Sequence, residues 1–306
     1  MNARAALLVG GFAVDQLLGD PQRFHPVAGF GKIAGSLEQR IWADDRRAGG
    51  VYALTLVGGT AVATGAGCVA LSGRPWARAS FELAVLWSAL AGRSLQRVAH
   101  AMSDELAADD IVAARRLAPS LVGRDPSALE EDELARATIE SVAENTGDGV
   151  IAPLFWFAVG GAPAVAAYRA ANTLDSIAGH RSERYLRFGW APARLDDLLN
   201  YVPARLGAAA VVVAASWHAG AALRVARAHG RRHPSPNAGL YEAAFAGALG
   251  LRLGGVNRYG DVLERRPELG DGAQPRVSDI RRATRLSGAT SLLFVVALAL
   301  SLERRT

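Results

Sequence analysis

One stretch of the chain decides the fold: residues 139–176 read IESVAENTGDGVIAPLFWFAVGGAPAVAAYRAANTLDS. Its central part, residues 150–168, has 19 residues and no charge, whereas acidic and amide side chains gather at both of its ends. A bilayer core of roughly 30 Å needs about 20 apolar residues in a helix. The stretch therefore predicts a helical segment of nearly membrane-spanning length with polar groups at each end.

Other uncharged stretches along the chain have the same character. A shorter apolar run contains Asp15, and the set of candidate membrane segments is 5–18, 51–73, 150–168, 206–223 and 286–302. We expect an all-α, polytopic membrane protein that forms a single integral membrane domain over residues 1–306. A soluble bundle of alanine-rich helices stays open as an alternative, because the mean hydropathy is only +0.13.

The composition excludes several classes of protein. Hydrophobic residues make up 50% of the 306 residues and charged residues 21%, which excludes a disordered chain. Cys68 is the only cysteine, so an intrachain disulfide scaffold is excluded as well. The net charge of +5 comes almost entirely from arginine, since Lys32 is the only lysine. We interpret this as a coding bias and expect no nucleic-acid partner.

Local patterns predict further helices and no strands. Apolar residues at helical spacing predict one amphipathic helix over residues 80–106. Ser127 with Glu130 matches a capping box, which predicts a helix over about 128–144. No alternating pattern of useful length is present.

A break in the central stretch predicts that the chain turns back within it. A straight helix over residues 150–168 would hold its two ends roughly 28 Å apart. Gly160-Gly161-Ala162-Pro163 lies in the middle, and such a sequence lowers the cost of interrupting a helix. We predict a re-entrant helical hairpin at 150–168. It would bring together polar residues from both ends, namely Glu144, Asn145, Asp148, Asn172 and Asp175. The alternative is a kinked but continuous span.

The residues before the hairpin have the chemistry of a binding site. Glu140, Glu144 and Asp148 recur every four residues, and on one helix face they would repel unless a cation binds there. We expect residues 145–149, Asn-Thr-Gly-Asp-Gly, to form a turn that leaves free N–H groups for an anion or a phosphate. Asn145, Thr146 and Gly147 are therefore candidate phosphate ligands.

The residues after the hairpin suit a divalent cation. Asn172 and Asp175 are three residues apart, and Arg169 lies one turn earlier. Mg²⁺ takes oxygen ligands, usually one or two carboxylates together with substrate phosphates. Asp148 and Asp175 are the predicted metal ligands.

Three further polar clusters lie at predicted helix ends. Each cluster could be part of a functional site, or it could be only a solvated loop at the end of a helix. Their residues are Asp15, Asp20 and His25 in the first cluster; Asp196, Asp197, Asn200 and Arg205 in the second; and His233, Asn237 and Glu242 in the third. Asp15 favours function, because an acid inside an apolar stretch is costly.

Known nucleotide-binding and hydrolase motifs are absent from the sequence, which has no P-loop, no HExxH, no GxSxG and no dinucleotide fingerprint. The residues alone predict a helical membrane protein with a site for a metal and a phosphate. They do not define the reaction.

The order and spacing of five motifs resemble the cobalamin biosynthesis protein family CobD/CbiB, the adenosylcobinamide-phosphate synthases. The motifs are DQLLGDPQRFHPV (15–27), TIESVAENTGDGVIAPLFW (138–156), AANTLDSIAGH (170–180), RYLRFGWAPARLDDLLNYVPARL (184–206) and SPNAGLYEAAFAGALGLRLGG (235–255). Many members have a lysine where this chain has Arg181, which would serve a phosphate instead.

The resemblance implies a multi-pass enzyme of the bacterial inner membrane. Such enzymes use ATP, with Mg²⁺, to join adenosylcobyric acid, a corrinoid, to aminopropanol or its O-phosphate. Other late cobalamin-pathway membrane enzymes are possible partners. On this basis Glu144, Asp148 and Asp175 are candidate catalytic residues, with Glu144 as the base. The candidate substrate and phosphate ligands are Asn145, Thr146, Gly147, Arg169, Asn172, Arg181, Arg205 and Asn237. The alternative function is a membrane transporter or an AmpE-like sensor whose intramembrane acids bind a cation.

Overall fold

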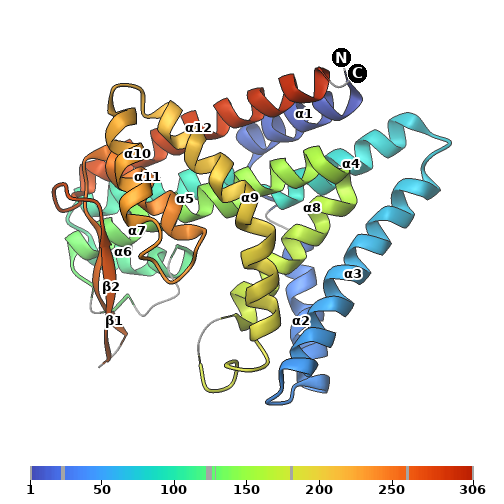
Figure 1. Ribbon diagram of the computed structural model, residues 1–306, viewed down its shortest axis with the longest axis horizontal. Coiled ribbons are helices and arrows are strands. Elements are labelled where there is room, and N and C mark those ends of the chain that lie inside the picture. The colour runs from blue at the N-terminus through green and yellow to red at the C-terminus, as the bar shows by residue number, and fades with distance from the viewer. Residues whose placement is uncertain are drawn as a thin grey trace. The chain divides into compact units, whose positions relative to one another are not determined.

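The computed structural model describes residues 2–21, 25–121, 126–127, 129–179, 182–259 and 262–304. This part of the chain is mainly helical and has only one small β-hairpin, which confirms the all-α prediction (Figure 1). Among these residues, four helices are long and apolar enough to cross a membrane: Arg46–Ala70, Glu131–Ala178, Trp190–Ala214 and Val277–Glu303. They fit the predicted membrane protein.

Two predicted segments end earlier in the structure: the helix predicted over 51–73 ends at Ala70, and the segment predicted over 206–223 is the other. The helix that contains residue 206 begins at Trp190 and ends at Ala214, so it does not continue to residue 223. It begins earlier because Asp196 and Asp197 lie within a regular helix rather than in a loop. It ends where Ser216 adopts a positive φ of 51°.

The chain divides into two compact units, which are described separately. Unit 1 contains Met1–Ala91, Asp148–Asn200 and Val295–Thr306, and unit 2 contains Gly92–Gly147 and Tyr201–Phe294.

Unit 1 is built mainly from five helices, whose bounds are α1 Ala3–Leu18, α2 Pro26–Ile41, α3 Arg46–Ala70, α4 Pro75–Ala89 and α8 Ala152–Ala178. Residues 190–200 of α9 (Trp190–Ala214) and the end of α12 (Val277–Glu303) complete it. Part of its core forms around Tyr52 and Phe188, whose ring centroids are 5.0 Å apart. The Asn2 N–H donates to Glu303 Oε1 over 2.7 Å and joins the two ends of the chain.

Helix α8 is broken at Gly161, where φ is 66° and ψ is −154°. Only glycine adopts this conformation readily. The Arg4 guanidinium lies 3.4 Å from the carbonyl oxygen of Ala158 and 3.3 Å from that of Val159, so it satisfies carbonyl groups beside the break.

The two parts of α8 fold back on each other, and the bend can be followed in Figure 1. Asp148 Oδ2 lies 3.2 Å from Asn172 Nδ2, although a straight helix would separate these residues by about 36 Å. The predicted helical hairpin is therefore confirmed, and the continuous span is wrong. The prediction that the hairpin enters and leaves the bilayer on one side stays a prediction.

Unit 2 contains α5 Gly92–Ala107, α6 Ile111–Leu117, α7 Glu131–Thr146, α10 Ala219–His229 and α11 Ala238–Leu249, with short 3₁₀ turns at Ala118–Ser120 and Ser216–His218. Most of α12 also belongs to it. Helix α11 is almost completely buried. An added Cβ at Gly147 or Gly207 would come within 2.3 Å or 2.0 Å of Tyr241, so both glycines are required by the packing of that side chain.

Unit 2 also has an antiparallel hairpin of β1 Leu253–Tyr259 and β2 Val262–Leu269, which the sequence analysis did not anticipate. Its register shifts between Leu253 and Gly255, and both Gly254 and Gly255 have a positive φ. This irregularity explains why no alternating pattern reveals the strands.

Three local predictions need correction. The helix predicted over residues 80–106 is two helices, because Leu90 is extended and the Ala91 N–H donates to the Gly149 carbonyl over 3.0 Å. Helix α7 begins at Glu131, and its capping box is formed by Glu130 with Glu133 instead of Ser127 with Glu130. The turn predicted at residues 145–149 is also wrong, because α7 continues into a π-helix over Gly147–Ile151.

Candidate functional site

A hydrogen-bonded network of polar side chains lies where the two ends of the α8 hairpin meet in unit 1. The Asn172 Nδ2 amide donates to Asp148 Oδ2 over 3.2 Å and to Asp196 Oδ1 over 3.2 Å. Its Oδ1 accepts from Arg169 Nη1 over 3.1 Å. Both donors and the acceptor of Asn172 are therefore engaged, which fixes its orientation and holds two carboxylates next to one amide.

Two more side chains extend this network. Asn200 Nδ2 donates to Asp196 Oδ2 over 3.0 Å, and the Tyr168 hydroxyl lies 3.0 Å from Asn200 Oδ1. The same hydroxyl is 3.2 Å from the Asp148 carbonyl oxygen. Tyr168 and Asn200 are almost completely buried. The network, named here the hairpin network, comprises Asp148, Tyr168, Arg169, Asn172, Asp196 and Asn200.

The helices position these groups through ordinary helical spacing. Tyr168 and Asn172 are four residues apart on α8, and Asp196 and Asn200 are four apart on α9, so each pair shares a face. The indole N–H of Trp156 donates to the Leu199 carbonyl over 3.1 Å and holds the first part of α8 against α9.

The network contains some of the predicted residues and one that was missed. Of the residues that the hairpin was predicted to bring together, Asp148 and Asn172 are in contact, and Arg169 joins them from the same helix as Asn172. The acid that shares Asn172 with Asp148 is Asp196, which the sequence placed only among other polar residues. Tyr168 was missed, since it looked like the end of an apolar stretch.

Two predicted acids have other surroundings. The Asp175 carboxylate lies so close to the end of α8 that an added Cβ at Gly179 would be 1.7 Å from its Oδ1. Asp197 forms an ion pair with Arg194 over 3.1 Å. The metal role of Asp175 stays a prediction.

The N-terminal polar motif lies close to Arg169 in the same unit. His25 Nδ1 accepts from the Val27 N–H over 3.2 Å and caps α2. Burial lowers the pKa of His25, the charge of Asp20 raises it and that of Arg169 lowers it. Asp15 is completely buried in α1, where its Oδ2 accepts from Gln16 Nε2 over 2.9 Å. The motif that contains His25 therefore lies near Arg169, the residue before the AANTLDSIAGH motif.

A second polar cluster lies in unit 2, at the start of α11. Arg205 Nη1 donates to Asn237 Oδ1 over 3.2 Å, and its guanidinium carbon lies 3.4 Å from the centroid of the Tyr201 ring. The Ser235 hydroxyl accepts from the N–H groups of Asn237 and Ala238 over 3.3 and 3.2 Å. Two predicted phosphate ligands, Arg205 and Asn237, are thus in contact.

A buried acid follows one turn later on α11. Glu242 Oε1 lies 3.6 Å from His233 Nε2, and His233 Nδ1 accepts from the Ser235 N–H over 3.1 Å. In the tautomer in which Nδ1 accepts this bond, Nε2 carries the hydrogen and faces Glu242. Burial raises the pKa of Glu242 well above its ordinary value, and the charges of Glu140 and Glu144 raise it further. The sequence places Glu242 and His233 in a polar cluster but predicts no specific role for either, although an acid within so apolar a helix is a recognisable signal.

We expect the unfolding free energy of the Glu242→Gln variant to fall less steeply with rising pH than that of the parent chain. Unfolded glutamate titrates near 4.3, whereas the raised pKa keeps folded Glu242 protonated above that pH. The folded state then binds more protons, so its unfolding free energy falls as pH rises from about 4.3 towards the raised pKa. Thermal unfolding in detergent across this window measures the slope. Glu131→Gln, at an exposed position of α7, is the control, and equal slopes in both variants would contradict the assignment.

The remaining predicted residues of α7 have internal partners. Asn145 Nδ2 donates to the Ser141 carbonyl over 2.9 Å. The buried Thr146 hydroxyl lies 2.6 Å from the Val142 carbonyl and 2.7 Å from Ser287 Oγ. Because the π-helix continues the helix here, no helix start presents free N–H groups, and the phosphate roles of Asn145, Thr146 and Gly147 lose that argument.

Glu144 is exposed on α7. Arg181 lies outside the described residues. Within the part of the chain that the structure describes, no group of three or more His, Cys, Asp or Glu side chains could hold a metal ion.

Comparison with known proteins links this geometry to one family. A family profile described as "CobD/Cbib protein" matches residues 8–287. The chain is 53% identical over 289 residues to the Mycobacterium tuberculosis (strain ATCC 25618 / H37Rv) protein named "Cobalamin biosynthesis protein CobD", covering 94% of this chain and 92% of the relative. No solved structure matches the chain.

More distant relatives carry the same name. The Geobacter metallireducens protein is 41% identical over 309 aligned positions, covering 97% of this chain and 96% of the relative. The Rhodobacter capsulatus protein is 39% identical over 318 aligned positions, covering 98% and 99%. The similarity therefore covers both units and every motif that the sequence analysis identified.

Proposed function

Because this chain belongs to the CobD/Cbib family of cobalamin biosynthesis proteins, we propose that it is the amide-forming ligase of that pathway. It would join adenosylcobyric acid to aminopropanol or aminopropanol phosphate at the expense of ATP, giving adenosylcobinamide or its phosphate. The observation that carries this proposal is the pair of carboxylates, Asp148 and Asp196, held by one amide beside Arg169.

The reaction explains why such a network is needed. A carboxylate does not react with an amine until it is activated, most simply by transfer of the γ-phosphoryl group of ATP to a carboxylate oxygen. ADP leaves in this step. The amine nitrogen then attacks the acyl carbon, loses a proton, and phosphate leaves. Phosphoryl transfer depends on positioning and on neutralising phosphate charge.

The hairpin network fits Mg²⁺ by its donor chemistry. Mg²⁺ prefers oxygen ligands and is usually held by one or two carboxylates, with waters and substrate phosphates completing its shell. A pair of acids is therefore sufficient, and a cluster of three is not required. Asp148 and Asp196 would hold the ion, and Asp175 is the further candidate on α8. The bound ion would supply positive charge to the phosphates of ATP.

Arginine side chains of the protein would bind the phosphate groups and neutralise their remaining negative charge. Arg169 already donates to Asn172, so its guanidinium is oriented within the hairpin network. The contact of Arg205 with Asn237 in unit 2 is the candidate site for the phosphate of the amine substrate, and Arg181 is a further candidate. Glu144, exposed on α7, is the candidate base for the amine proton.

The four candidate spans support a location in a membrane. We place the protein in the bacterial inner membrane as a multi-pass enzyme, where it would take the corrinoid from the membrane surface. Other late cobalamin-pathway membrane enzymes would be its neighbours.

The test is an amidation assay with protein purified in detergent. Adenosylcobyric acid, ATP and Mg²⁺ are incubated with aminopropanol or with aminopropanol phosphate, and the products are identified by mass. We expect an amide whose formation requires ATP. If well-folded protein forms no amide with either amine and consumes no ATP, the proposed function is wrong, and cation uptake by proteoliposomes then tests the transporter alternative.

A further inference from the structure

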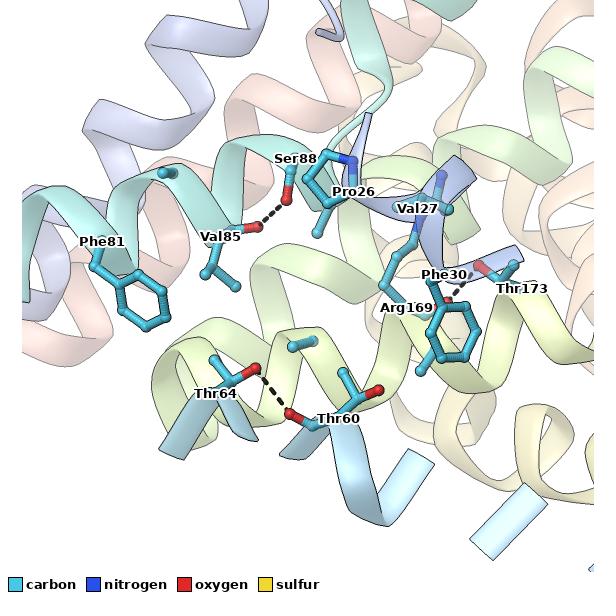
Figure 2. A pocket seen from close by; sticks show the side chains of 14 residues that line it. Pro26, Val27, Phe30, Thr60, Thr64, Phe81, Val85, Ser88, Arg169 and Thr173 are labelled. Atoms are coloured by element: carbon cyan, nitrogen blue, oxygen red, sulfur yellow. Dashed lines mark hydrogen bonds between the residues drawn. The ribbon is translucent and has the colours of Figure 1, made fainter. Parts of the chain in front are cut away.

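A cavity of about 400 Å³ lies within unit 1, between α2, α3, α4 and the second part of α8 (Figure 2). Its volume equals that of about 13 water molecules in liquid water. Helix α3 belongs to the set of helices that are long and apolar enough to cross a membrane, and α8 forms part of another. The cavity therefore lies among candidate membrane segments.

The walls of this cavity are apolar even where they carry hydroxyl groups. Thr60, Thr64 and Thr173 donate to the carbonyl four residues earlier in their own helices, over 2.7, 2.8 and 2.7 Å. Ser88 donates to the Val85 carbonyl over 2.9 Å. The bonds of Thr64, Ser88 and Thr173 are drawn in Figure 2. These hydroxyl hydrogens are engaged in the wall and are not offered to a ligand.

Arg169 is the exception among the described residues that line the cavity, because it alone carries a charge. Its Nη1 donates to Asn172 in the hairpin network, but its Nε is buried and has no hydrogen-bond partner among the described residues. In Figure 2 its side chain lies beside Val27 and Phe30. The guanidinium carries further N–H groups besides Nη1 and Nε, and an anionic group at this end of the cavity would accept from them and balance the charge of Arg169.

These features define the occupant. A nucleotide base would bury several ring nitrogen acceptors against walls whose hydroxyl hydrogens are already engaged, and each acceptor left without a donor would weaken binding. A hydrocarbon chain needs no hydrogen bonds. The anionic headgroup of a lipid would accept hydrogen bonds from the Arg169 guanidinium. We infer that the cavity binds one acyl chain of an anionic phospholipid, whose phosphate accepts from the Arg169 guanidinium. This inference goes beyond the proposed amide-forming reaction, and it assigns a second ligand to a side chain, Arg169, that the proposed function already uses.

The consequence is a link between the lipid and the hairpin network. The lipid phosphate would accept from the guanidinium of Arg169 on its cavity side while Nη1 stays on Asn172. The guanidinium would then be held from two sides, and an anionic lipid would help to order the network.

The test uses phosphatidylglycerol with a photoactivatable group on its acyl chain, bound to the purified full-length protein. After irradiation, labelled residues are mapped by mass spectrometry. We expect label on cavity residues such as Thr60, Phe81 and Ala166. Unlabelled phosphatidylglycerol should compete about tenfold better than phosphatidylcholine, because a hydrogen bond to a charged group contributes about 1.5–3 kcal/mol.

Matched variants distinguish labelling inside the cavity from labelling of the outer surface of the helices. Ala166→Phe fills the cavity and should lose the label, whereas Ala167→Phe, the next residue on α8 and also half-buried, should keep it. Ala84→Phe, at an exposed lining position, gives a second test if Ala166→Phe does not fold. Label confined to outward residues such as Leu54, label unchanged in the filled variants, or protection by ATP or a corrinoid instead of phosphatidylglycerol would overturn the inference.

Discussion

The Asp148→Asn and Asp196→Asn variants should each lose about a hundredfold or more of the amide-forming kcat, comparable to removing one preorganised electrostatic group from an active site. Both substitutions keep the size of the side chain and an oxygen that can accept from Asn172. Each removes one negative charge from the hairpin network. The loss should therefore reflect charge rather than shape.

The matched control for these variants is Asp197→Asn. Asp197 is the neighbour of Asp196 on α9 and pairs with the largely exposed Arg194. A surface ion pair of this kind contributes little, so this variant should keep nearly normal turnover. Normal turnover in Asp148→Asn and Asp196→Asn, measured with limiting Mg²⁺, would remove the metal assignment.

Gly161→Ala is expected to destabilise the protein by about 1–3 kcal/mol, the usual cost of a strained backbone conformation. Gly161 has φ 66° and ψ −154°, a combination that an alanine adopts only with strain. A variant that straightens the helix instead would pull Asp148 away from Asn172, with loss of activity as well as stability.

Unfolding in detergent, followed by circular dichroism, measures this effect. Gly58→Ala is the control, because an added Cβ at Gly58 meets nothing within 4 Å and alanine favours a helix. Its stability should be unchanged or slightly raised. If Gly161→Ala is as stable as Gly58→Ala, the break in α8 is not a feature of the folded protein.

The hairpin could be predicted from the sequence because its signals are local. Two glycines and a proline interrupt an otherwise apolar helix, and the polar residues that must meet lie at its two ends. The contact of Asp148 with Asn172 follows from that geometry alone.

The identity of the second acid could not be predicted in the same way. Asp175, Asp196 and Asp197 all follow the hairpin at helical positions, and the sequence does not say which face of a distant helix turns towards α8. That choice depends on tertiary packing, including the hydrogen bond from Trp156 to the Leu199 carbonyl.

Some local structure was also hidden from sequence patterns. The break between α4 and α5 lies at Leu90 and Ala91, which are good helix formers, and it is stabilised by a contact with Gly149 from a distant segment. Gly147 suggests a turn by composition, yet it is a glycine because the Tyr241 ring occupies the space of a side chain. Tertiary contacts override local preference at each of these positions.

The central claim is that Asp148 and Asp196, joined through Asn172, act as one site. A double-mutant cycle on kcat/KM for amide formation tests it most directly, with Asp148→Asn, Asp196→Asn and the double variant. Residues that act as a unit have strongly non-additive effects. We therefore predict that the double variant has about the same kcat/KM as the less active of the two single variants. A loss equal to the product of the two single losses would mean that the two acids act independently, and it would contradict this account.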